Sequence, residues 1–249
     1  MPRASHRFLA VAGVVALGAV PLSSCASESR GVDVSGDWPS SAATAAAQDD
    51  APSMLVFGDS WTFGLAASTP TGGYAYLAGL ELGWNTTVDG ENGSGYLHPG
   101  EHGGLYGTRV VQLDPELDPD LVVVQGSIND RASDLSTLSR AANGVWEALE
   151  RMYPDAELVI LGPAPATLPV DESVERIDEI LGDLAQTEGL DYISPLQEQW
   201  ITKSNYDTVI DSSSTGHYHP SDTGHAYLAE KLAEHISEIA PEDLAIASE

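Results

Sequence analysis

Three side chains that could act together on an ester stand far apart in the chain: Ser60, Asn129 and His219. A serine hydroxyl is a weak nucleophile until a neighbouring base removes its proton, and the imidazole of His219 could be that base. The carboxamide of Asn129 could donate a hydrogen bond to the oxyanion that forms on the attacked carbonyl. Together these residue types predict acyl transfer through a serine nucleophile.

Two of these residues, Ser60 and Asn129, also have an ordinary structural interpretation. Ser60, in Gly58-Asp59-Ser60, could simply cap a helix, and Asn129 could simply form a turn. A second oxyanion donor is predicted in Asn92-Gly93-Ser94-Gly95-Tyr96, since a glycine lets the backbone N–H approach a substrate closely. Gly95 is the favoured donor and Gly93 is the alternative register; the N–H of Ser60 itself is a further candidate.

Short apolar runs supply the strands that must position these residues. Residues 54–57, 121–125 and 158–161 are β-branched or apolar without polar alternation, as in parallel strands that helices cover on both faces. Weaker strands are predicted over 86–88 and 192–193. Helical patterns lie between the strands, over 74–82, 133–152, 172–187 and 221–239. The alternation predicts a three-layer α/β/α fold, flavodoxin-like, with a mainly parallel sheet of about five strands.

The predicted sheet brings the chemical residues to one edge. Sites in such folds form in the loops at the carboxyl ends of the strands. Ser60 follows the strand over 54–57, and Asn129 follows the strand over 121–125. His219 precedes Pro220, which suits the start of the last helix because its φ is fixed and it lacks an N–H. Trp61 is expected to touch substrate.

Taken in order, these blocks resemble the SGNH or GDSL-type hydrolase superfamily over about residues 55–232. The resemblance implies that Ser60 is the nucleophile and that Asn129 and Gly95 form the oxyanion hole. It also implies that His219 is the base, and that the activity is carboxylic ester hydrolysis without a cofactor. The family includes esterases, lipases and carbohydrate acetylesterases, so the substrate is expected to be a lipid acyl or a carbohydrate acetyl ester.

One position departs from the family pattern. The family usually places an aspartate three residues before the histidine, and here that residue is Gly216. Asp211 is the nearest upstream carboxylate that could orient His219, and a backbone carbonyl near Gly216 is the alternative. His225 has an aspartate three residues before it, but it lacks a following proline and falls inside the last helical pattern.

Two rival functions remain open at this point. His217, His219 and His225, with Asp222, crowd one stretch and could bind zinc. However, the chain has no His-Glu-x-x-His pattern, so no metal is expected. The second rival is a catalytically weakened or inactive surface protein that binds glycans or lipids, which the missing aspartate favours. The survival of the serine, asparagine and histidine together favours the enzyme.

The amino terminus predicts export and a lipid anchor. Residues 1–25 combine two arginines with an apolar run too short to span a bilayer, as in a signal peptide. Leu22-Ser23-Ser24-Cys25 resembles a bacterial lipobox, which would make Cys25 the lipidated first residue of the mature chain. Residues 26–52 are rich in small and polar residues and predict a tether. A hydrolase domain is expected over 53–240, with a tail over 241–249.

The net charge of the chain limits the classes of partner that it can bind. The chain carries 38 acidic and 10 basic residues, a formal net charge of −28, which disfavours binding to nucleic acid. We expect a monomer that is anchored to the outer face of the bacterial cell membrane. Its substrate is expected to be a small ester, a lipid or an acetylated glycan. With Cys25 as the one cysteine, no intramolecular disulfide can form.

Overall fold

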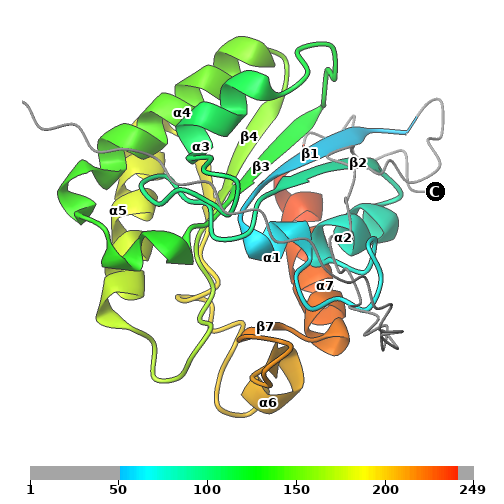
Figure 1. Ribbon diagram of the computed structural model, residues 1–249. Coiled ribbons are helices and arrows are strands. Elements are labelled where there is room, and N and C mark those ends of the chain that lie inside the picture. Colours follow the sequence, from blue (N-terminus) through cyan, green and yellow to red (C-terminus); the bar gives the residue numbers. More distant parts are fainter. Residues whose placement is uncertain (1–50, 241–249) are drawn as a thin grey trace, which may run out of the picture. The chain divides into compact units, whose positions relative to one another are not determined.

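The computed structural model describes residues 51–240, which build one parallel sheet with helices on both faces (Figure 1). The strand order is β2-β1-β3-β4-β5, and every neighbouring pair runs parallel. The strands are β1 (Ser53–Gly58), β2 (Asn85–Gly90), β3 (Leu121–Gln125), β4 (Glu157–Leu161) and β5 (Asp191–Ile193). In the register of the sheet, Val56 lies between Val88 and Val123.

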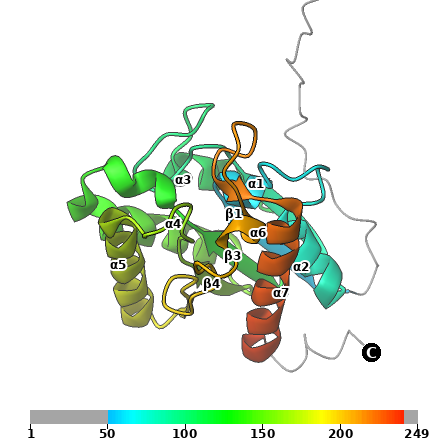
Figure 2. The ribbon, with the colours of Figure 1, turned by 90° about the horizontal axis from the view of Figure 1, so that it is seen from below.

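Four long helices form the two outer layers. The helices of the described residues are α1 (Ser60–Phe63), α2 (Tyr74–Leu82), α3 (Tyr106–Arg109), α4 (Leu138–Met152), α5 (Glu172–Glu188), α6 (Tyr206–Val209) and α7 (Asp222–Ile239). Short 3-10 turns cover Val110–Gln112, Ile128–Ala132 and Leu135–Thr137. Helices α2 and α7 cover one face of the sheet, and α4 and α5 cover the other (Figure 2).

Alternate residues of β1 show why the sheet needs both layers. Met54 and Val56 pack into the core on the side of α2 and α7, whereas Leu55 and Phe57 pack into the core on the side of α4 and α5. All of these side chains are almost fully buried. A strand that is apolar on both faces is stable only when helices cover both, which is why these runs show no polar alternation.

The start of α7 is fixed by contacts with α6. Ser221 accepts a hydrogen bond from the N–H of Gly224 at 3.0 Å and donates to the carbonyl of Thr208 at 2.7 Å. A Cβ on Gly224 would lie 2.0 Å from the carbonyl oxygen of Val209, so a side chain is excluded there. Just before this cap, β7 (His219–Pro220) pairs antiparallel with β6 (Ile210–Asp211). His219 therefore lies on a short strand that is fixed by its pairing with β6 and by the helix cap that follows it.

The predicted fold class is confirmed, including all five strands. One helix boundary was wrong: the helix predicted from residue 133 begins at Leu138. Asp134 accepts a hydrogen bond from the N–H of Ser136 and caps a separate 3-10 turn, which competes with helix at this point. The predicted signal over 1–25 with Cys25, most of the tether over 26–52 and the tail over 241–249 lie outside the described residues.

Across residues 51–240, none of the helices has both the length and the apolar character needed to cross a bilayer.

Candidate active site

Ser60 is presented by a tight turn at the carboxyl end of β1. Asp59 caps α1 by accepting a hydrogen bond from the N–H of Trp61 at 2.9 Å, and Ser60 is the first residue of that helix. A Cβ on Gly58 would lie 2.3 Å from the Thr62 hydroxyl, so the turn tolerates only glycine before Asp59. Because Ser60 stands at the first helical position, no intrahelical carbonyl can accept its N–H.

The imidazole of His219 meets the hydroxyl of Ser60. Nε2 of His219 lies 2.8 Å from Oγ of Ser60, and Nδ1 lies 3.1 Å from the carbonyl oxygen of Gly216. A carbonyl can only accept, so Nδ1 carries the proton and Nε2 of the neutral ring accepts from the serine hydroxyl. This is the tautomer that a general base for Ser60 requires.

Burial sets the protonation state of that base. It lowers the pKa of His219 below its usual value of 6.5, while hydrogen bonds to the backbone at Gly216 and His217 act in the opposite direction. The lowered pKa favours the neutral ring, which can accept a proton, over the charged ring.

Asn129 points its carboxamide toward the turn Gly58-Asp59-Ser60, the nucleophile turn. Its Nδ2 donates to the carbonyl of Ser94 at 3.0 Å and lies 3.5 Å from Oδ2 of Asp59. The second contact is at the outer limit of hydrogen-bond length, so that N–H can be redirected toward a developing oxyanion at small cost.

The Asp59 carboxyl in this contact has a raised pKa. Burial is the main cause, and it raises the pKa of Asp59 to about 7.

The predicted role of Gly95 as an oxyanion donor does not match the geometry. The N–H of Gly95 already donates to the carbonyl of His98 at 2.8 Å. The carboxylate of Asp130 accepts hydrogen bonds from the N–H groups of Tyr96, Leu97 and His98, which attaches this loop to the 3-10 turn after β3. A Cβ on Gly95 would lie 2.5 Å from Asp130, so the glycine serves this close approach.

The prediction that Asp211 orients His219 is also wrong in this structure. The carboxylate of Asp211 accepts a hydrogen bond from the N–H of Ser213 at 2.9 Å. Both ring nitrogens of His219 are occupied, by Gly216 and by Ser60. The orienting group is therefore the backbone carbonyl, the alternative that the sequence left open.

The competing histidine, His225, has a structural role. It is fully buried, its Nδ1 accepts the N–H of Tyr74 at 3.2 Å, and its Nε2 donates to the carbonyl of Leu65 at 3.2 Å. Burial lowers its pKa to about 4. His225 thus links α7 to the loop before α2. Over residues 51–240, the structure has no group of three or more His, Asp or Glu side chains that could hold a metal ion.

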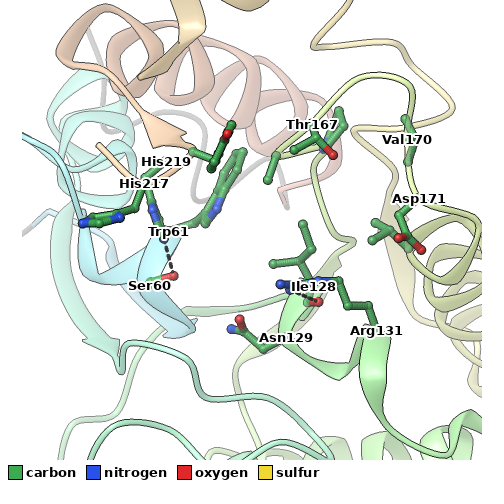
Figure 3. A pocket seen from close by; sticks show the side chains of 14 residues that line it. Ser60, Trp61, Ile128, Asn129, Arg131, Thr167, Val170, Asp171, His217 and His219 are labelled. Carbon is green, nitrogen blue, oxygen red and sulfur yellow. Dashed lines mark hydrogen bonds between the residues drawn. The ribbon is translucent and has the colours of Figure 1, made fainter. Parts of the chain in front are cut away.

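The pocket over Ser60 has a volume of about 210 Å³ and brings Ser60, Asn129 and His219 together (Figure 3). Trp61 lines it, with its ring centroid 6.5 Å from that of His219, and its contact with substrate stays a prediction. The sequence did not predict most of the remaining wall, because these residues come from loops, the 3-10 turn over Ile128–Ala132 and the start of α5: Ile128, Arg131, Pro165, Ala166, Thr167, Val170, Asp171, Val174, His217 and Tyr218.

Arg109 stabilises the nucleophile turn through its contacts with the backbone, and no sequence motif predicted this role. Its guanidinium donates to the carbonyls of Gly58 at 2.8 Å and Asp89 at 2.9 Å, and it pairs with the carboxylate of Asp89. Its Nε lies 3.5 Å from a carboxylate oxygen of Glu91, and its guanidinium stacks over Phe57 at 4.5 Å. These contacts tie the ends of β1 and β2 together. A signal that could have found Arg109 is the rarity of basic residues in the chain.

Comparison with known proteins decides the family. Residues 56–227 match the model of the GDSL-like Lipase/Acylhydrolase family. The chain belongs to this family. As such it is a carboxylic ester hydrolase.

Individual relatives agree with this assignment. The hydrolase is 29% identical over 200 residues to GDSL lipase Rv0518 of Mycobacterium tuberculosis, covering 74% of this chain and 81% of that protein. It shares its fold with a family 2 carbohydrate esterase of Corynascus thermopiles (Myceliophthora fergusii), at a TM-score of 0.61 and 18% identity, covering 78% and 68% of the two chains. The aryl esterase of M. smegmatis has a similar fold as well, with a TM-score of 0.60 and 15% identity, covering 76% of this chain and 100% of that one.

Proposed function

We propose that this hydrolase cleaves carboxylic esters through an acyl-enzyme on Ser60, with His219 as the base. The observation that carries the proposal is the 2.8 Å contact between Oγ of Ser60 and Nε2 of His219 inside a pocket that Asn129 also lines. A binding protein would not need a hydroxyl and a correctly oriented imidazole at this distance. The contact therefore favours the enzyme over an inactive binding protein.

The reaction has two steps. Oγ of Ser60 bonds to the carbonyl carbon while its proton passes to Nε2 of His219. The amide of Asn129 and the N–H of Ser60 stabilise the oxyanion, and the carbonyl of Gly216 stabilises the imidazolium. His219 then gives the proton to the departing alcohol as the C–O bond breaks. Water attacks the acyl-enzyme with the same proton transfers, and the carboxylic acid leaves.

A substitution series with a covalent probe tests this mechanism. Ser60→Ala and His219→Ala should each lower kcat/KM for p-nitrophenyl acetate by about a thousandfold or more. A fluorophosphonate should label the parent protein and not the Ser60→Ala variant. Ser136→Ala, an exposed serine away from the pocket, is the matched control. Undiminished turnover by Ser60→Ala would exclude the mechanism, and an unlabelled, inactive parent protein would favour the binding protein.

We also propose that the hydrolase works at the outer face of the cell membrane, attached through a lipid on Cys25. The support is the sequence alone: an apolar export segment followed by Leu-Ser-Ser-Cys, then a polar tether before a hydrolase domain over 53–240. In fractionated cells the protein should sediment with membranes, and Cys25→Ser should release it or block its maturation. Sedimentation of the Cys25→Ser protein exactly as its parent would contradict the anchor.

A further inference from the structure

The wall of the pocket opposite the catalytic pair carries two opposite charges. Ser60 and His219 lie on one side, and Arg131, Thr167 and Asp171 lie across from them (Figure 3). Arg131 lies in the 3-10 turn after β3, and Asp171 is the residue that caps α5. Because these side chains face the space next to the nucleophile, they meet whatever part of the substrate extends from the ester.

Arg131 has donors to spare. One guanidinium nitrogen donates to the carbonyl of Ile128 at 3.0 Å, which holds the side chain in place. Arg131 forms no salt bridge with another residue of the described range 51–240. A guanidinium carries five N–H donors, so several remain available to a ligand. Arg140 and Lys203 also form no salt bridge within residues 51–240, so what distinguishes Arg131 is its place in the pocket wall.

Asp171 and Thr167 supply complementary groups. One carboxylate oxygen of Asp171 accepts the N–H of Ser173 at 2.8 Å as the cap of α5, and the other is an acceptor for a ligand. The Thr167 hydroxyl can donate or accept. Separate donors and acceptors on one wall match hydroxyl groups, because each hydroxyl both donates and accepts. A phosphate or carboxylate would match Arg131 but would be repelled by Asp171.

Aromatic side chains complete the setting. Trp61 lines the pocket beside His219 but is only 4% exposed, whereas Tyr218, at the pocket wall, is 49% exposed. The exposed aromatic side chain of Tyr218 beside polar groups suits a molecule with C–H faces and hydroxyl edges. An alkyl chain would satisfy the rings, but it would cover Arg131 and Asp171 without giving them hydrogen bonds, which is unfavourable.

We propose that Arg131, Thr167 and Asp171 form the subsite for the alcohol part of the substrate, and that this alcohol is a neutral sugar. This proposal rests on the proposed function, since it assumes that the ester carbonyl sits at Ser60. The substrate class is therefore an acyl ester of a sugar hydroxyl.

The test compares two acetyl esters that differ only in the alcohol. Full-length protein is assayed with a methyl glucoside monoacetate and with p-nitrophenyl acetate. Arg131→Met and Asp171→Asn should each lower the ratio of kcat/KM for the sugar ester to kcat/KM for p-nitrophenyl acetate by about tenfold or more. Asparagine also caps helices well, so Asp171→Asn should keep α5 intact. Arg140→Met, an exposed cation on α4 outside the pocket, should leave the ratio unchanged.

Other outcomes overturn the proposal in distinguishable ways. An unchanged ratio in both variants, with Ser60-dependent turnover, would refute the sugar subsite and leave the acyl-enzyme mechanism standing. Activity in Ser60→Ala would remove the proposed function and the subsite with it. As a third arm, a lysophospholipid turned over faster than the sugar ester, with loss of that activity in Arg131→Met, would assign the cation to an anionic head group instead.

Discussion

At the scale of single residues, the protonation of His219 controls when Ser60 can be activated. Only the neutral ring can accept the serine proton, and burial lowers the pKa of this ring below 6.5. Activity should therefore be lost as the pH falls through a pKa below that value. We expect the acid limb of kcat/KM for p-nitrophenyl acetate, measured from pH 4 to 8, to have its midpoint below 6.5.

Trp61 provides the comparison for this pH profile, because its ring flanks that of His219. Trp61→Ala should admit water to the imidazole and move the acid limb upward, toward the ordinary value for histidine. A parent midpoint at or above 6.5 would show that burial does not dominate the pKa of His219.

Asp59 makes a separate prediction about stability. Burial raises its pKa from 3.8 to about 7, so the folded protein binds this proton more tightly than the unfolded chain does. The stabilisation is complete below the unfolded pKa and is lost as the pH rises through the folded one. Asn cannot ionise, so the Asp59→Asn variant does not lose this stabilisation. Its free energy of unfolding should therefore increase relative to that of the parent as the pH rises from 4 to 8. The gain is expected to be about 2–4 kcal/mol from a shift of this size.

Urea unfolding at pH 4.5 and pH 8 measures this gain. Asp207→Asn, which removes an exposed carboxyl, controls for the loss of one acidic group. A stability difference between Asp59→Asn and its parent that stays constant across this range would contradict the raised pKa.

At the scale of elements, the sequence predicted those features that depend on local patterns. Apolar runs placed β1 and β3, and the carboxyl-end rule then placed Ser60 and Asn129 at one edge of the sheet. The partners of backbone groups could not be predicted in this way. That Gly95 donates to His98, and that Gly216 orients His219, depends on how two loops fold in three dimensions. The charged wall of the pocket could not be predicted for the same reason, since Arg131 and Asp171 come to line one pocket only in the folded protein.

The loop between β6 and β7 explains the missing family aspartate and yields a prediction. A Cβ on Gly216 would lie 2.1 Å from Cγ of Asp211 and 2.4 Å from its backbone oxygen. An aspartate at this position therefore cannot fit without moving the segment whose carbonyl orients His219. We expect Gly216→Asp to lower kcat/KM for p-nitrophenyl acetate by about tenfold or more and to lower Tm, although it restores the family pattern. Ser212→Asp, an exposed site in the same loop, controls for the added charge. Higher activity in Gly216→Asp would mean that the loop adapts and completes a triad.

At the scale of the whole molecule, charge is the dominant property. With 38 acidic and 10 basic residues, most carboxylates have no cation available as a partner. The basic residues that do form ion pairs include Arg109 behind the nucleophile turn and exposed helix pairs such as Arg151 with Glu147. Exposed pairs contribute little, typically below about 1 kcal/mol. The folded chain therefore concentrates like charges that the unfolded chain would spread apart.

This charge predicts that salt stabilises the hydrolase. The Debye length falls from about 30 Å at 0.01 M to about 3 Å at 1 M ionic strength, so added salt screens the repulsion between surface carboxylates. Raising NaCl from 0.02 to 0.5 M at pH 7.5 should raise Tm by a few degrees, roughly 1–2 kcal/mol of unfolding free energy at the midpoint. KCl at the same ionic strength should have the same effect, because screening does not distinguish the two cations. A Tm that falls with NaCl would contradict the prediction, and a rise with only one of the salts would indicate binding of a specific ion instead of screening.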